Sequence, residues 1–314
     1  MGKLHISSNP HIHQKGATTQ NIMLDVVIAM LPATIAGIVI FGINALWTVL
    51  VCVASAVLSE FLFNLCVHKK QTIGDLSAVV TGLLLALNLS TAVPLWQCAL
   101  GSVFAIVVVK CLFGGLGKNI VNPAITARVF MLLTFGAVAA VSLPTVVELT
   151  ATATPLAALN QGVEVAAAEA PSIMDLFLGL HGGAIGETCA LALLIGFAYL
   201  VIRRVIKWYV PAAFVGTTFV CYLVYGGFDV VFALQHVLAG GLLLGAIFMA
   251  TDYVTTPTTN KGRVVFCVGA GLLTFAIRQF GMYPEGVSIA ILTMNLLTPY
   301  INDFTKKKTL GGIK

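Results

Sequence analysis

The chain has 314 residues, of which 59% are hydrophobic and only 9% are charged, and its mean hydropathy is +1.00. Because soluble domains carry about 25% charged residues, this composition excludes a water-soluble globular protein. Ten membrane crossings of ~20 residues would use ~200 residues, so no large domain is expected outside the bilayer. The first 21 residues are polar and lack the apolar core and cleavage site of a secretory signal peptide.

Ten apolar segments predict ten transmembrane helices. The expected spans are residues 22–41, 46–67, 76–89, 95–113 and 123–143, and then 188–202, 208–225, 230–250, 264–277 and 287–301. The third segment is short for a complete crossing unless it begins at Thr72. No stretch alternates apolar and polar residues as membrane β-strands do. The predicted fold class is therefore an all-α polytopic membrane protein.

The basic residues predict how these helices are oriented. In a ten-span chain all of the 17 Lys and Arg residues except Arg278 fall at one face, which is then the cytoplasmic face and holds both termini. The loop of residues 144–187 has five acidic residues and no Lys or Arg, so it is expected outside. The net charge of +5 follows from this topology and indicates no binding of nucleic acid.

Two short matches suggest that the second half of the chain repeats the first. The sequence GLLL occurs at 82–85 and again at 241–244, and Phe113-Gly114 is echoed by Phe280-Gly281. Because each half holds five spans, the second copy must enter the membrane upside down, with a functional site near the repeat interface and broken helices around it. The expected organisation is a cytoplasmic arm (1–21), a first repeat (22–143), an outer loop (144–187), a second repeat (188–301) and a basic cytoplasmic tail (302–314).

Two polar interruptions of the apolar sequence, residues 113–128 and residues 250–263, are candidates for lining a cavity at that interface. Glycines permit a tight left-handed loop, and a helix that begins at Pro123 offers free amides to an anionic or carbonyl group. The alternatives are an ordinary capped turn for the first interruption and a plain cytoplasmic loop for the second. The candidate residues are Gly114, Gly115, Gly117, Asn119, Asn122 and Arg128 in the first, and Asp252 in the second.

Two acidic residues within the spans are candidates for an ion pathway, because a carboxyl group in hydrocarbon is costly. Glu60 lies deep in the second span and Asp25 early in the first. Glu60 could instead form a helix–helix hydrogen bond in its protonated form, and Asp25 could lie at the membrane interface. The seven cysteines are scattered without a CxxC pair, and His11 and His13 alone fall short of a metal site. No metal site or catalytic residue is predicted.

Four motifs in the same order resemble one known family. They are the polar N-terminal arm, FGGLGKNIVNPA at 113–124, ELTATATPL at 148–156 and FMATDYVTTPTT at 248–259. Together they are similar to the D-type membrane protein of the Rnf complex and to its relative, the B-type membrane protein of the sodium-pumping NADH:quinone reductase. The resemblance covers essentially the whole chain. The B-type protein usually carries a longer N-terminal extension, so the Rnf type is favoured.

The resemblance implies a ten-helix component of a redox-driven Na⁺ or H⁺ pump that links ferredoxin and NAD in the inner membrane of a prokaryote. Other Rnf subunits are implied as partners, and the chain alone is expected to be inactive. Two alternatives remain open: a B-type component of the quinone reductase, and a solute channel or transporter with inverted repeats. A channel would have no need of a threonine-rich motif on an outer loop.

The resemblance also implies cofactors. FMN would be joined through its phosphate to Thr154 by an ApbE-type flavin transferase acting outside the cytoplasm. Thr152, Ala153 and Pro155 continue the attachment motif, whereas Glu148 stands where the family usually has Asp, and residue 151 is Ala where a hydroxyl residue is common. Riboflavin held without a covalent bond is implied as well, with no residue assigned to it.

Overall fold

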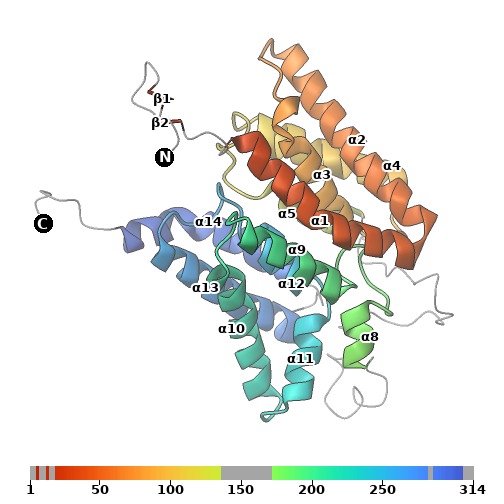
Figure 1. The fold of residues 1–314 in the computed structure, drawn as a ribbon, viewed down its shortest axis with the longest axis vertical. Coiled ribbons are helices and arrows are strands. Elements are labelled where there is room, and N and C mark those ends of the chain that lie inside the picture. The colour runs from red at the N-terminus through yellow and green to blue at the C-terminus, as the bar shows by residue number, and fades with distance from the viewer. Residues whose placement is uncertain (1–4, 7–11, 14–17, 136–171, 282–285, 307–314) are drawn as a thin grey trace, which may run out of the picture.

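The computed structural model describes residues 5–6, 12–13, 18–135, 172–281 and 286–306. Within these ranges the protein is a bundle of helices, in which those of the first half lie together at the upper right of Figure 1 and those of the second half below them. The strands of the described part are β1 (His5–Ile6) and β2 (Ile12–His13), which pair antiparallel. The predicted all-α class is confirmed.

The first half begins with two long helices and continues with shorter ones. Its elements are α1 (Thr19–Phe41), α2 (Ile43–Cys66), the 3₁₀ turn η1 (Ile73–Asp75), α3 (Ser77–Leu87), α4 (Leu95–Val103) with its π-helical continuation η2 (Phe104–Cys111), and α5 (Pro123–Phe135). α3 rises only about 16 Å over its 11 residues, which is about half of the hydrocarbon core. The chain beyond α3 therefore stays inside the protein, where Leu89 and Ser90 are buried.

The second half contains a broken helix. Its elements are α8 (Ile173–Leu178), α9 (Ala190–Ile202), α10 (Tyr209–Tyr225), α11 (Val230–Leu238), α12 (Leu242–Leu244) with the π-helix η4 (Gly245–Met249), α13 (Asn260–Phe280) and α14 (Val287–Thr305). The span expected at 230–250 is bent by 67° between α11 and α12, where Gly240 has a φ of +70°. α8 was not expected and begins with a capping box between Ser172 and Asp175.

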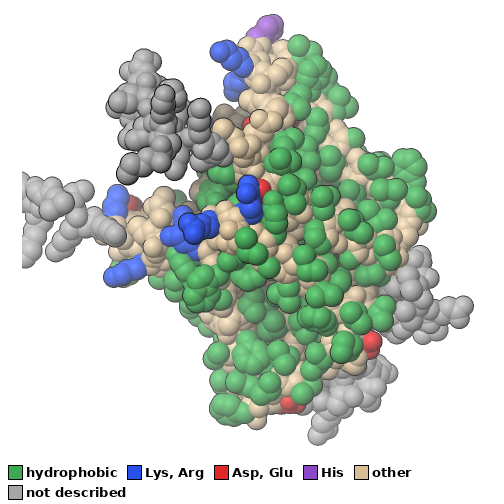
Figure 2. All heavy atoms as spheres, viewed as in Figure 1, with side chains coloured by type: hydrophobic (Ala, Val, Ile, Leu, Met, Phe, Trp, Pro, Cys, Tyr) green, Lys and Arg blue, Asp and Glu red, His purple; other side chains and the backbone are tan. Residues whose placement is uncertain are grey.

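Length and composition allow several of these helices to cross a bilayer. Among the described residues α1, α2 and α13 are each long and apolar enough, and the bent pair of α11 and α12–η4 would make a fourth span. Shorter apolar helices are α3, α4–η2, α5, α9 and α10. Figure 2 shows hydrophobic side chains over much of the face of the bundle in view, with Lys and Arg gathered toward the upper left. The protein is therefore a multi-pass membrane protein.

Three of the basic residues considered in the charge rule are buried. Lys110, Arg128 and Arg278 are each at most 6% exposed. Arg278, the exception to the charge rule, donates from Nη1 to the carbonyl of His236 (2.8 Å) and from Nη2 to that of Ala239 (3.3 Å). It therefore satisfies the carbonyl groups that the end of α11 leaves unpaired. Its place in the chain reflects the broken helix and says nothing about which loops face the cytoplasm.

Candidate functional site

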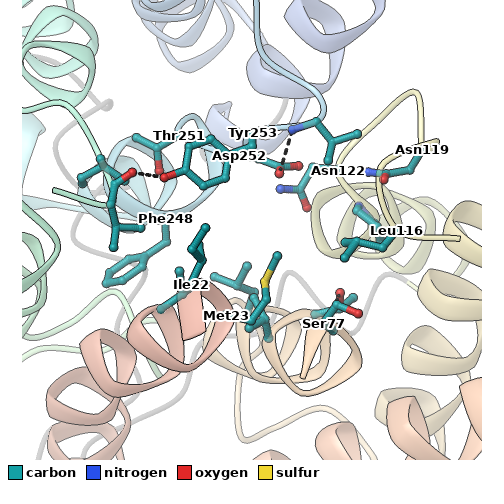
Figure 3. Close-up of a pocket in the computed structure, with 18 of the residues that line it drawn as sticks. Ile22, Met23, Ser77, Leu116, Asn119, Asn122, Phe248, Thr251, Asp252 and Tyr253 are labelled. Carbon is teal, nitrogen blue, oxygen red and sulfur yellow. Dashed lines mark hydrogen bonds between the residues drawn. The ribbon is translucent and has the colours of Figure 1, made fainter. Parts of the chain in front are cut away.

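A cavity between the two halves of the chain brings both polar interruptions together. It encloses about 790 Å³ of space between protein atoms, part of it open to solvent. One wall is α1 and the start of α3, and the opposite wall is the segment that follows η4 (Figure 3). Its polar lining includes Ser77, Lys110, Asn119, Asn122, Thr251 and Asp252, and its apolar lining includes Ile22, Met23, Leu84 and Phe248.

The loop before α5 adopts the tight conformation that its glycines allow. Gly114, Gly115 and Gly117 have φ angles of +112°, +96° and +87°, a region that other residues rarely occupy. Their backbone shapes the loop, and its later residues Asn119 and Asn122 reach the cavity. Asn122 Oδ1 accepts from Ala124 N (3.0 Å) and Ile125 N (3.4 Å). These two amides are therefore engaged by a helix cap, as in the simpler alternative.

The segment after η4 folds around Asp252. Its Oδ1 accepts from Val254 N (3.2 Å) and its Oδ2 from Thr255 Oγ1 (3.0 Å). Burial raises the pKa of the Asp252 carboxyl, and these hydrogen bonds offset part of the rise. The simple alternative of an exposed cytoplasmic loop does not describe this residue, because its carboxyl faces the cavity (Figure 3).

A residue that the sequence did not single out joins the two interruptions. Asn295 on α14, with its amide in the hydrogen-bonding orientation, accepts from Asn122 N and donates to Thr255 O, both at 3.2 Å. Thr298, one turn along α14, donates to the same carbonyl at 2.9 Å. One helix therefore fixes the spacing between the two interruptions. An asparagine in an otherwise apolar helix was the signal that could have found it.

A buried ion pair lies directly behind the cavity. Lys110 Nζ is 2.9 Å from Glu60 Oε2 and 2.6 Å from Ser77 Oγ, and the two charged side chains are 3% and 2% exposed. Thr72 donates to the other carboxylate oxygen of Glu60 at 2.6 Å. Glu60 is therefore half of an ion pair, in place of the protonated helix–helix hydrogen bond considered above. Lys110 and Ser77 connect this pair to the cavity wall.

Arg128 lies in a second polar cluster, away from the cavity lining. Its Nη1 donates to Asn88 Oδ1 (2.8 Å) at the end of α3 and to Ser288 Oγ (3.3 Å) at the start of α14. Glu187 is close by: a Cβ on Gly241 would lie 2.9 Å from Glu187 Oε2 and 3.6 Å from Arg128 Nη1. This cluster lies between the end of the short helix α3, at Asn88, and the start of α12, at Gly241.

The remaining candidates lie elsewhere. Asp25 accepts from Tyr199 Oη (2.9 Å) and forms an ion pair with Arg203 Nε (3.2 Å), whose side chain is 55% exposed. This pair sits beside the cavity without lining it. The flavin-attachment candidates Thr154, Thr152, Ala153, Pro155 and Glu148 lie outside the described residues, so the structure does not test them. No group of three metal-ligating side chains occurs in the part that it describes.

Comparison with known proteins identifies the family. A profile of the NQR2, RnfD, RnfE family matches residues 5–311. Over 314 residues the chain is 45% identical to the D subunit of the Na(+)-translocating ferredoxin:NAD(+) oxidoreductase complex of Acetobacterium woodii, with 99% of this chain and 96% of that protein covered. It is 39% identical over 321 residues to the D subunit of the proton-translocating ferredoxin:NAD(+) oxidoreductase complex of Clostridium ljungdahlii (98% and 96% covered). It is 34% identical over 349 residues to the D subunit of the ion-translocating oxidoreductase complex of Escherichia coli O7:K1 (98% and 99% covered). The chain therefore belongs to the NQR2, RnfD, RnfE family.

Proposed function

We propose that this chain is the D-type membrane component of an ion-translocating ferredoxin:NAD oxidoreductase. The near-full-length similarity to two D subunits, whose complexes are named for Na⁺ and proton translocation, carries the proposal. The other Rnf subunits are its partners in the membrane. Among the alternatives, a B-type component of a quinone reductase shares the family, and a solute channel shares only the architecture of repeats.

The packing of the helices supports an inverted repeat of two five-helix halves. If the halves correspond in order, α1 matches α9 and α5 matches α14. Each of these matched pairs packs directly together, as expected for elements that meet across a pseudo-two-fold axis. Likewise α2 packs on α4 as α10 packs on α13. The loop of residues 144–187 then lies outside and both termini lie in the cytoplasm, which reporter fusions at Gln161 and after Lys314 would test.

The cavity between the halves suits a flavin ring without a phosphate. An apolar lining with a few polar groups fits a flat ring with one polar edge. Its lysine, Lys110, is already paired with Glu60, and Asp252 adds an acidic group. No uncompensated positive charge remains for a phosphate among the described residues that line it, which favours riboflavin over FMN. A bound flavin would supply one- and two-electron transfer.

Covalent FMN at Thr154 is the second cofactor of the proposal. A transferase outside the cytoplasm can reach a threonine only on an outer loop, and the small neighbours Thr152 and Ala153 leave it unobstructed. Pro155 disfavours a helical conformation at Thr154 and so favours an extended segment. A tether would keep the flavin on the electron path without relying on free FMN.

The decisive experiment is flavin fluorescence of the chain in a denaturing gel, after expression in a host with an ApbE-type transferase. Thr154→Ala should abolish the fluorescent band and ferredoxin-dependent NAD reduction by the assembled complex, while the matched control Thr145→Ala, outside the attachment motif, keeps both. A band that survives Thr154→Ala and disappears in Thr150→Ala or Thr152→Ala would move the attachment site. An unlabelled wild-type chain from such a host would refute the covalent cofactor.

A further inference from the structure

A second, smaller cavity opens beside the first, at the turn between α9 and α10. It encloses about 560 Å³ of space between protein atoms, part of it open to solvent, against about 790 Å³ for the first. Its charged lining is Arg204 and Lys207 from the turn and Arg263 from the first turn of α13, joined by the hydroxyl residues Thr256 and Tyr253. Tyr253 also lines the first cavity, so the two are neighbours.

The charges of this second cavity are unbalanced. No acidic side chain of the described residues lines it, and within the described ranges none of its three cations forms an ion pair. Lys207 Nζ bonds to Asn260 Oδ1 (2.7 Å) and Arg263 Nε to Pro257 O (3.0 Å), both neutral acceptors. Each side chain keeps unused N–H donors.

Two other cations at the same end of the molecule are neutralised. Arg203, which adjoins Arg204 in the chain, pairs with Asp25, and Lys306 pairs with Asp303 at 3.0 Å. Lys261, which lies outside the cavity lining, likewise has no acidic partner among the described residues. What distinguishes the second cavity is that it gathers three such cations. An anion with several acceptor oxygens would satisfy the donors that the protein leaves unused.

The backbone at Arg204 adds an independent observation. Arg204 has a φ of +58°, and the bonds from Arg204 N to Val201 O (3.0 Å) and from Val205 N to Leu200 O (2.9 Å) close the end of α9 around it. This is the position at which helices usually place glycine, because a side chain there is strained. At this position the chain instead has the large, positively charged side chain of Arg204, which lines the second cavity.

The surroundings of the cavity indicate the membrane interface. Ile202 and Trp208, which flank the turn, are 79% and 64% exposed. Tryptophan is enriched where the bilayer meets water, and basic groups at that level attract anionic lipids. Tyr253 also lines the cavity, and its partial burial raises the pKa of its phenol while the nearby Arg263 offsets part of the rise.

We propose that Arg204, Lys207 and Arg263 form a binding site for the phosphate of an anionic phospholipid. The headgroup phosphate lies among the three cations, and the acyl chains run outward over Ile202 and Trp208. The site depends neither on the flavins nor on the direction of electron flow.

The test compares the purified complex in neutral detergent with two variants. Arg204→Gly/Lys207→Gln removes two of the cations and places glycine where the backbone favours it, so the fold should be retained. Lys306→Gln is the matched control, since it removes a cation outside the cavity. Native mass spectrometry counts bound phosphatidylglycerol, with phosphatidylcholine and inorganic phosphate as separate additions.

A cation near an anionic membrane surface contributes about fivefold in binding, so the double variant should bind phosphatidylglycerol about 25-fold more weakly. The Lys306→Gln complex should bind it as the wild type does, and phosphatidylcholine should not compete. Equal binding of phosphatidylglycerol by the wild type and the double variant would overturn the proposal. Displacement of the lipid by an equal concentration of inorganic phosphate would also overturn it. So would a double variant that loses a protein subunit of the complex but keeps its bound lipid.

Discussion

The buried pair of Lys110 and Glu60 allows a quantitative prediction about stability. Substituting Lys110→Met removes the charge 2.9 Å from Glu60 Oε2 and leaves a carboxylate that is 2% exposed with only the hydrogen bond from Thr72. At an effective dielectric constant of ~20, two unit charges at this distance attract by about 6 kcal/mol. Desolvation cancels part of that attraction, and breaking one side of a buried pair typically costs about 3–5 kcal/mol.

The double variant Glu60→Gln/Lys110→Met separates the pair from its surroundings. It removes both charges, so we expect its free energy of unfolding to be only about 1–2 kcal/mol below that of the wild type. This loss is smaller than the loss expected for Lys110→Met alone. The exposed Lys118→Met is the control for loss of a lysine and should change stability by less than ~0.5 kcal/mol.

Unfolding of the purified chain in mixed micelles, titrated with sodium dodecyl sulfate, measures these differences. The ion pair predicts strong non-additivity: the double variant is more stable than the sum of the two single changes by several kcal/mol. If the effects of Glu60→Gln and Lys110→Met simply added, the two groups would not be coupled, and the argument from the buried pair would be wrong.

Two further predictions concern other parts of the fold. A Cβ on Gly196 would overlap the carbonyl oxygen of Ala29, so Gly196→Ala should push α9 from α1 and lower stability by about 1–3 kcal/mol or more, whereas Gly216→Ala, which has open space, should be nearly neutral in the same titration. Because burial raises the pKa of Asp252, its carboxylate is lost at a higher pH than an ordinary carboxyl as the pH falls. In wild-type proteoliposomes, ion uptake that depends on the Asp252 carboxylate should therefore begin to decline at a higher pH than an ordinary carboxyl would give. Asp252→Asn should remove this pH-dependent decline. An identical pH profile of the wild type and the variant would exclude a role of the carboxylate in ion uptake.

Long apolar runs made most of the fold predictable. The helices α1, α2 and α13 follow directly from such runs, because a chain in lipid must satisfy its own backbone groups. The break between α11 and α12 did not follow, since Ala239, Gly240 and Gly241 also fit an apolar span. It depends on Arg278, some forty residues later, which satisfies the carbonyls of His236 and Ala239. A contact of that kind leaves no local pattern.

The candidate site was predictable where local composition changed. Glycine, asparagine and hydroxyl residues interrupt apolar sequence at Asn119, Asn122 and Asp252, and all three line the cavity. Lys110 was missed as a site residue because it stands near the end of an apolar run, where a lysine normally marks the membrane edge. Its partner lies 50 residues earlier in the chain, on α2. Only the packing of η2 against α2 brings the two charges together.

The charges in the two neighbouring cavities argue for two different ligands. In the larger cavity Lys110 is neutralised by Glu60 and an acidic side chain, Asp252, faces inward. In the smaller cavity three cations lack acidic partners among the described residues. A buried phosphate without compensating charge is costly, so a phosphorylated ligand would be disfavoured in the first cavity and favoured in the second. Because Tyr253 forms part of both walls, the segment after η4 separates a site for an uncharged ring from a site for an anion.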